Sequence, residues 1–200
     1  MKYEKDCLII RNKIDWVTDF TNWMGEGLKE ALERKHWSVV DLSGPEASPS
    51  NVSYWLQSRD RKISKLIIDF DHGYPEKLVG QQRKEEATII DRHNAEDCTN
   101  NLDVYTFACS TGVRGGLGEY AVRHGCRSWL GYTDTIYWDP FIAEDFKKCV
   151  WSYPLAMADG LSAKCCYDKL VDSYKNLSQK SMICEWNLRK LVLITDDHSD

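Results

Sequence analysis

The chain has 200 residues, a length that suits one domain or at most two small ones and can bury a substantial core. Its 42% hydrophobic and 28% charged residues are ordinary for a globular protein and exclude a disordered or fibrous chain. With 26 basic against 31 acidic residues, the formal net charge of -5 disfavours a nucleic-acid-binding protein built on a basic surface.

The sequence shows no membrane or secretion signal. No apolar run approaches the ~20 residues that a membrane helix needs, and the first hydrophobic stretch, at 7–10, is interrupted by Arg11 and Lys13. We therefore expect a cytoplasmic protein without a membrane partner. Its eight cysteines, of which Cys165 and Cys166 are adjacent, then indicate free thiols, and the lack of a C-x-x-C motif argues against structural zinc.

The first third of the chain alternates between strand and helix patterns. Hydrophobic periodicity predicts a strand at 6–11, a helix at 16–35, a strand at 37–42, a helix at 50–59 and a strand at 65–71. The last strand is nearly continuously apolar, which is typical of a strand buried on both faces of a parallel sheet.

The remainder continues the alternation after a polar, irregular segment at 74–101. The pattern predicts a hairpin strand at 87–91, a helix at 94–99, strands at 102–108 and 128–132 around a helix at 117–124, helices at 140–151 and 161–177, a strand at 188–195 and a frayed acidic tail at 196–200. Because parallel strands need crossover connections covered by helices, we expect one α/β domain over 1–200. It should be a three-layer sandwich around a mainly parallel sheet of about six strands.

Two of the predicted strands end in residues suited to covalent chemistry. The strand at 65–71 runs into His72 and Gly73, and the strand at 102–108 runs into Cys109. Carboxyl ends of neighbouring parallel strands share one rim of a sheet, so the two side chains are expected within reach of each other. A thiol beside a base is the arrangement that acyl transfer requires. The sequence therefore predicts Cys109 as nucleophile and His72 as general base.

The glycines near these residues suit the same chemistry. Gly73 can turn the backbone sharply, and its N–H together with that of Cys109 would form an oxyanion hole. A glycine-rich turn at 112–118 separates Cys109 from the helix predicted at 117–124. We expect helix-terminal amides and a charged imidazole to lower the pKa of the Cys109 thiol. This chemistry needs no metal and no organic cofactor.

These segments resemble the caspase-like (clan CD) cysteine peptidases, especially the gingipain and CHAT branches. The resemblance is carried by Asp-Phe-Asp-His72-Gly73, by Tyr-Thr-Phe-Ala-Cys109-Ser-Thr-Gly112, by the run from Gly116 to Gly131, by the helix start Asp159-Gly160-Leu-Ser162 and by the terminal strand. It implies a caspase-hemoglobinase-like fold and an endopeptidase with the catalytic pair His72 and Cys109. It also implies backbone oxyanion donors at Gly73 and Cys109.

Two acidic residues are candidates for substrate binding. Asp134 follows the strand at 128–132, where this family often builds its specificity pocket, and would favour a basic residue before the cut bond. Asp71 directly precedes His72; side chains alternate along a strand, so Asp69 and Asp71 face away from His72. The alternative for these two is a solvated or capped strand end. Caspase specificity is not carried over, because Phe-Ala-Cys109-Ser departs from the caspase motif Q-A-C-[RQG]-G.

Other histidines and motifs favour structural roles. His93 and His124 are rival bases that lack a glycine-turn context, so surface or capping roles are expected for them. The glycine-rich turn at 112–118 lacks the Lys-Ser/Thr of a phosphate-binding loop. Trp129, Trp138 and Trp151 are expected in the core or in a pocket wall.

The sequence thus predicts a cysteine endopeptidase that cleaves protein or peptide substrates through a thioacyl intermediate. One rival is a catalytically silent caspase-like signalling or interaction module, which keeps the fold and binds a partner. Another is a flavodoxin-like binder of a small ligand, suggested only by the strand and helix alternation. Since no sensing domain accompanies the predicted domain, we expect regulation by a protein partner.

Overall fold

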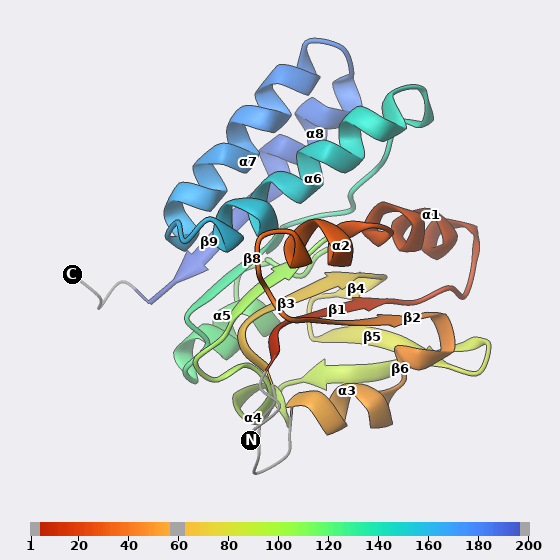
Figure 1. The fold of residues 1–200 in the computed structure, drawn as a ribbon, viewed down its shortest axis with the longest axis vertical. Helices are drawn as coiled ribbons and strands as arrows, with labels where there is room; N and C mark the ends of the chain where they lie inside the picture. Colours follow the sequence, from red (N-terminus) through yellow and green to blue (C-terminus); the bar gives the residue numbers. More distant parts are fainter. Residues whose placement is uncertain (1–4, 57–62, 197–200) are drawn as a thin grey trace.

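The computed structural model describes residues 5–56 and 63–196 (Figure 1). Residues 57–59 of the helix predicted at 50–59, and all of the predicted acidic tail except Asp196, lie outside these ranges.

A six-stranded sheet forms the centre of the fold. Its order is β2-β1-β3-β7-β8-β9, and every pair is parallel except the antiparallel pair of β8 and β9. The strands are β1 (Lys5–Arg11), β2 (Val39–Ser43), β3 (Ile63–Phe70), β7 (Asp103–Thr106), β8 (Ser128–Tyr132) and β9 (Leu191–Thr195). The prediction of an α/β fold with a mostly parallel sheet of about six strands is confirmed.

Helices cover both faces of this sheet. One face packs against α1 (Trp16–Gly25), α2 (Leu28–Glu33), α6 (Ala143–Ala158), α7 (Ala163–Ser178) and α8 (Met182–Lys190). The other packs against α3 (Pro49–Leu56), α4 (Ala95–Thr99) and α5 (Leu117–Arg123). Figure 1 shows α6, α7 and α8 above the sheet and α3 and α4 below it. Short 3-10 turns precede α3 and α6, at Gly44–Glu46 and Pro140–Ile142.

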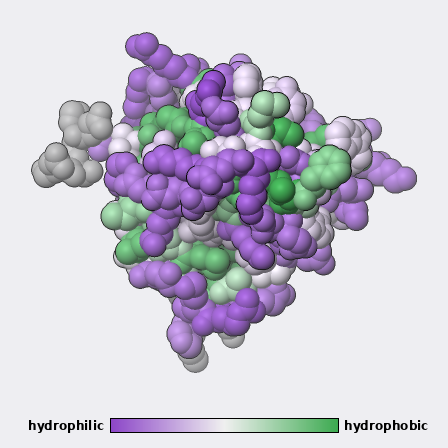
Figure 2. All heavy atoms as spheres, turned by 90° about the horizontal axis from the view of Figure 1, so that it is seen from above, coloured by the Kyte–Doolittle hydropathy of each residue, from purple (hydrophilic) through white to green (hydrophobic). Residues whose placement is uncertain are grey.

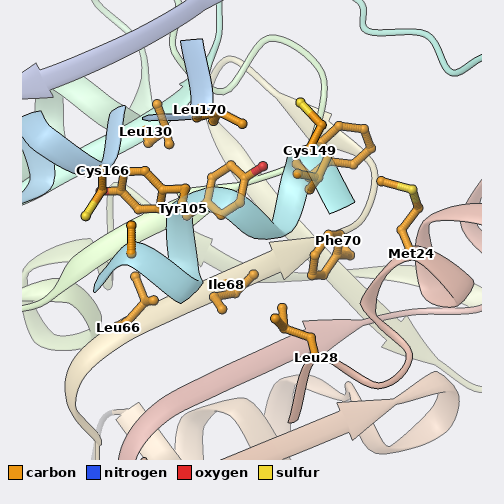
Figure 3. Packing of buried hydrophobic residues seen from close by; sticks show 14 of the residues in the cluster. Met24, Leu28, Leu66, Ile68, Phe70, Tyr105, Leu130, Cys149, Cys166 and Leu170 are labelled. Carbon is orange, nitrogen blue, oxygen red and sulfur yellow. The ribbon is translucent and has the colours of Figure 1, made fainter. Parts of the chain in front are cut away.

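Burial on two faces explains the continuous apolar character of β3. Its side chains alternate, so Ile68 and Phe70 enter one core cluster while Ile67 enters the other. Figure 3 shows the first cluster, in which Met24 and Leu28 lie near β3, with Tyr105, Cys149 and Leu170 beyond it. Fully burying one such aliphatic side chain contributes roughly 1.5–3 kcal/mol, so these layers account for much of the fold's stability.

A small antiparallel sheet follows β3 directly. It contains β4 (Gly73–Tyr74), β5 (Lys77–Gln82) and β6 (Glu85–Asp91), in that order. Only the third of these strands was predicted, at 87–91. Leu78 and Ile90 of this sheet are fully buried against the second core cluster, so the sheet covers the end of β3 on that face.

Three predicted elements differ from the structure. The helix predicted at 16–35 is broken into α1 and α2, because Gly27 adopts a left-handed conformation with φ +82°. The helix predicted at 140–151 continues to Ala158. The strand predicted at 188–195 is wrong for 188–190, because α8 occupies 182–190 and β9 starts at Leu191.

The surface seen in Figure 2 is mainly hydrophilic, with hydrophobic residues in patches between hydrophilic ones. Patches of this kind are normal on a folded protein. Within the described ranges, none of the helices combines the length and the apolar content needed to cross a membrane.

Candidate active site

The pairing of β3 with β7 brings the segments of His72 and Cys109 to one rim of the sheet. Asp69 lies opposite Thr106 in this parallel pair, and the Phe107 N–H donates to the Asp69 carbonyl at 2.7 Å. His72 lies three residues after Asp69, and Cys109 lies three residues after Thr106. The predicted meeting of the two strand ends is therefore present in the structure.

Gly73 packs directly against the backbone of Cys109. A Cβ atom built on Gly73 would lie 2.4 Å from the Cys109 carbonyl oxygen, 2.6 Å from Thr111 Cγ2 and 2.8 Å from Ala108 Cβ. No side chain fits into this space, so glycine is required by the close approach of the two backbones. This contact places the residue after His72 against the residue expected to act as nucleophile.

Asp15 holds the imidazole of His72 from the start of α1. Its Oδ2 lies 2.8 Å from His72 Nε2, while its Oδ1 accepts the Thr18 N–H at 2.9 Å. Thr18 Oγ1 in turn accepts the Asp15 N–H at 2.9 Å, which completes a capping box. One carboxyl group therefore caps a helix and anchors the candidate base.

The electrostatics of Asp15 fit this role. Partial burial acts to raise its pKa, but the hydrogen bonds from the Thr18 backbone and from His72 outweigh burial and place the pKa below its ordinary value. The carboxylate can only accept a hydrogen bond, so Nε2 carries a proton in this pair. Nδ1 of the neutral ring then has the lone pair that can remove a proton.

Asp15 was not among the predicted site residues. The signal was present in the sequence, because Asp15-x-x-Thr18 before an apolar run is a recognisable helix start. The hydrogen bond between Asp15 and His72, however, joins residues 57 positions apart and depends on the adjacency of β1 and β3.

The Cys109 thiol is half-buried and contacts the loop after β8. The Ile136 N–H donates to Cys109 Sγ at 3.4 Å. Burial raises the pKa of this thiol; the Ile136 N–H lowers it and the Asp134 charge raises it, and the net result is a pKa above the ordinary value. The prediction of a lowered thiol pKa is wrong, because burial outweighs the backbone N–H donors of Ile136 and of Cys109 itself.

The loop that carries Cys109 is tied to the end of β8. The Ser110 N–H donates to the Asp134 carbonyl at 3.1 Å, and the Gly112 N–H donates to the Tyr132 carbonyl at 2.8 Å. Ser110 has φ +58°, an uncommon conformation for a residue with a side chain. Strain of about 1–3 kcal/mol persists only where surrounding contacts enforce it, and such residues cluster at functional sites.

Asp134, one of the two acidic candidates, lies beside this loop. Its Oδ2 is 3.0 Å from Lys190 Nζ, and its Oδ1 accepts the Thr135 N–H at 2.8 Å. The hydrogen bonds from Lys190 and Thr135 lower the pKa of this exposed carboxyl. Asp134 is thus next to the candidate nucleophile, but its charge is shared with Lys190.

Asp71, the other acidic candidate, lies in the interior together with Asp69. The expectation of a solvated strand end is wrong for both, because the small sheet of β4, β5 and β6 covers this face. Asp71 Oδ1 accepts the His72 N–H at 2.7 Å, so the capping alternative describes it better. A carboxyl in this position fixes the backbone of His72 and does not present a charge at the surface.

The remaining candidates have the expected structural positions. His93 is exposed, and the exposed His124 follows α5 as its C-cap and stacks on Tyr120 with ring centroids 4.0 Å apart. Trp129 is fully buried and Trp138 stacks on Phe20 at 3.8 Å. The Trp151 indole donates to the Met24 carbonyl at 2.7 Å. All eight cysteines are free thiols, as expected.

The geometry therefore supplies a histidine anchored by Asp15, a half-buried thiol after the adjacent strand, and close backbone contact between Gly73 and Cys109. A scan against protein-family models and a search of curated proteins found no match for the chain.

Proposed function

We propose that this protein is a caspase-like cysteine endopeptidase in which Cys109 is the nucleophile and His72 the general base. One observation carries the proposal: His72, oriented by Asp15, begins the segment that packs against the Cys109 backbone. An acid that orients a base, which in turn activates the nucleophile, is the arrangement by which enzymes activate a weak nucleophile. The parallel sheet with a histidine after β3 and a cysteine after β7 fits the same resemblance.

The proposed reaction proceeds through a thioester. Nδ1 of His72 takes the thiol proton as Cys109 Sγ attacks the scissile carbonyl carbon, and the new oxyanion accepts the N–H groups of Gly73 and Cys109. The C–N bond then breaks, and the imidazolium gives its proton to the leaving amine. Water, deprotonated by His72, hydrolyses the thioester to a carboxylic acid and restores the thiol.

The raised thiol pKa determines the resting state of the proposed pair. Cys109 is predominantly protonated at neutral pH, because its pKa lies above the ordinary value. Proton transfer to His72 must therefore accompany the attack on the substrate. An arriving substrate that displaced Ile136 from Sγ would change the environment of the thiol at that step.

The test separates Cys109 from a second, exposed thiol. Cys165 is exposed, so labelling should be done in a Cys165→Ser background with an irreversible thiol-reactive peptide probe. We expect one labelled site at Cys109 and no labelling in Cys109→Ala. On a fluorogenic peptide library, Cys109→Ala should show no turnover. The turnover rate of His72→Ala should fall roughly 10²–10⁴-fold. His93→Ala, which alters an exposed histidine, is the matched control. Undiminished turnover by His72→Ala would exclude the assigned base.

One contact favours the silent interaction module as a second candidate. The Ile136 N–H donates a hydrogen bond to Cys109 Sγ. The thiol is also half-buried and has a raised pKa, as expected for a sulfur that does not react. In that case the probe would fail to label Cys109 over the whole pH range in which the protein stays folded. Labelling together with cleavage would exclude this candidate.

A further inference from the structure

A buried polar cluster lies beneath the rim that carries His72, on the opposite face of the sheet. It consists of Asn12, Asp69 and Asp71, whose exposed fractions are 0%, 0% and 4%. Ile10 pairs with Asp69 between β1 and β3, so Asn12 follows β1 at the level of Asp71. The Asn12 amide contacts Asp71 Oδ1, which connects the ends of the two strands.

Most of the oxygen atoms in this cluster have no protein partner. Both carboxylate oxygens of Asp69, Oδ2 of Asp71 and Oδ1 of Asn12 lack a hydrogen-bond partner among the described residues. Burying one unpaired carboxylate is costly, and two on the same strand face also repel each other. The cluster therefore needs a compensating positive charge or a proton.

The nearest basic side chains along the chain are engaged elsewhere. Arg11 forms a bidentate ion pair with Asp41 at 2.8 Å, and Lys13 lies 3.7 Å from Asp19. Burial raises the pKa of Asp69. Burial and the Asp69 charge also raise the pKa of Asp71, although the hydrogen bond from the His72 N–H acts to lower it. Without a bound cation, these carboxyl groups would hold protons at a pH where ordinary carboxyl groups do not.

We propose that Asn12, Asp69 and Asp71 bind a divalent hard cation of the Ca²⁺ or Mg²⁺ type. Carboxylate and amide oxygens are the ligands that such ions prefer, and two carboxylates balance the charge of the ion. The ligand set is two carboxylates and one carboxamide. Among the described residues, no three His, Cys, Asp or Glu side chains gather into such a group. Water would fill the remaining coordination positions.

A cation bound by this cluster would stabilise the backbone segments that carry Asp15 and His72. Asn12 lies three residues before Asp15, and Asp71 accepts the His72 N–H at 2.7 Å. The ion would therefore connect the two chain segments that carry the orienting acid and the base. The proposal itself does not depend on peptidase activity, because it rests on the buried oxygens alone.

The first test measures binding directly. The chelator-treated 200-residue protein is dialysed against CaCl₂ or MgCl₂, and the retained metal is measured by elemental analysis. We expect one cation per chain. At a free concentration about 100 times the Kd, the thermal midpoint should rise by roughly 5–10 °C. The comparison of the two salts identifies the preferred ion.

Variants then locate the ion. Asp69→Asn and Asp71→Asn should lose both the retained metal and the cation-dependent shift. In chelator, each variant should unfold at or above the wild-type temperature, because the amide needs neither a buried charge nor the uptake of a proton on folding. Asp19→Asn, which alters a nearby exposed carboxyl paired with Lys13, should keep the wild-type response.

Some outcomes would overturn the proposal. If the wild-type protein retains neither ion at millimolar free concentration and its thermal midpoint is unchanged, the cluster holds a proton instead. Metal retention and a thermal shift that both persist in Asp69→Asn and Asp71→Asn would place the ion elsewhere. Should either variant fail to fold, the wild-type dialysis alone decides whether a cation binds. None of these measurements uses turnover, so loss of the peptidase proposal would leave the result intact.

Discussion

His72 Nε2 lies 2.8 Å from Asp15 Oδ2, and this contact joins the candidate base to the start of α1. The other oxygen of the same carboxyl accepts an N–H from the first turn of that helix, that of Thr18. The positive end of a helix favours a negative charge at this position. The orientation of the imidazole and the stability of α1 therefore depend on one side chain.

Asp15→Asn should separate these two roles. Asparagine caps a helix nearly as well as aspartate, so the free energy of unfolding should change by only a few tenths of a kcal/mol. When the amide oxygen of asparagine accepts the Thr18 N–H, its NH2 group faces Nε2 and donates instead of accepting. The imidazole then adopts the wrong tautomer, and kcat/KM should fall roughly 10²–10⁴-fold. Unfolding in denaturant and a pH profile of kcat/KM measure the two effects. Unchanged kcat/KM and an unchanged profile would mean that Asp15 only caps the helix.

Asp15→Ala should remove both roles and lose about 1 kcal/mol of stability as well. The pKa of Asp15 is lowered in the folded protein, so its contribution is fully present above the unfolded pKa of about 3.9. It is lost as the pH falls through the lower folded pKa. The stability difference between wild type and Asp15→Ala should therefore be constant near neutral pH and shrink below about pH 4. A difference that does not change with pH would show that the carboxylate charge contributes nothing.

The pH dependence of Cys109 alkylation should report a neutral thiol. Its pKa is raised by burial and by the Asp134 charge, so the thiolate fraction should increase about tenfold per pH unit up to at least pH 9. A small uncharged alkylating reagent on the Cys165→Ser protein measures the rate, with Cys109→Ala as the blank. A plateau reached between pH 6 and 7 would instead indicate a preformed thiolate and imidazolium pair.

The sequence predicted the parts of the fold that depend on local pattern. The apolar run of β3 and the His72-Gly73 and Cys109 exits placed the two segments at one rim, because parallel pairing follows from burial on both faces. The small sheet after β3 was largely missed, since β5 includes the weakly strand-forming Gly80, Gln81 and Gln82 and forms by antiparallel pairing with β6.

Properties that depend on tertiary contact could not be predicted. The contact of Asp15 with His72 needs β1 beside β3, and the burial of Asp69 and Asp71 needs the cover of the small sheet. The thiol pKa was predicted in the wrong direction because helix amides and imidazole were considered without the desolvation of Cys109. Residues 188–190 were assigned to a strand because Leu188 was grouped with the apolar run of β9, although Arg189 and Lys190 separate the two.

Lys190→Met should reveal whether Asp134 selects basic substrates. The substitution removes the ammonium that lies 3.0 Å from the Asp134 carboxylate and leaves a chain of similar length. Under the proposed function, kcat/KM for substrates with Lys or Arg before the cut bond should rise roughly tenfold relative to Leu, the effect of one charged hydrogen bond. The double variant Lys190→Met/Asp134→Asn should lose this gain. An unchanged ratio in a fluorogenic panel would remove Asp134 from the specificity pocket.

Gly73→Ala tests the contact that brings the two strand ends together. The new methyl would lie 2.4 Å from the Cys109 carbonyl oxygen, so one backbone must move, at a cost of about 1–3 kcal/mol. Gly160→Ala is the matched control, since its Cβ meets open space and only its φ of +82° costs about 1–2 kcal/mol. Both proteins should be destabilised to a similar extent, but only Gly73→Ala should lose turnover when assayed well below its thermal midpoint. Full turnover in Gly73→Ala would show that the spacing between the His72 and Cys109 segments does not control the reaction.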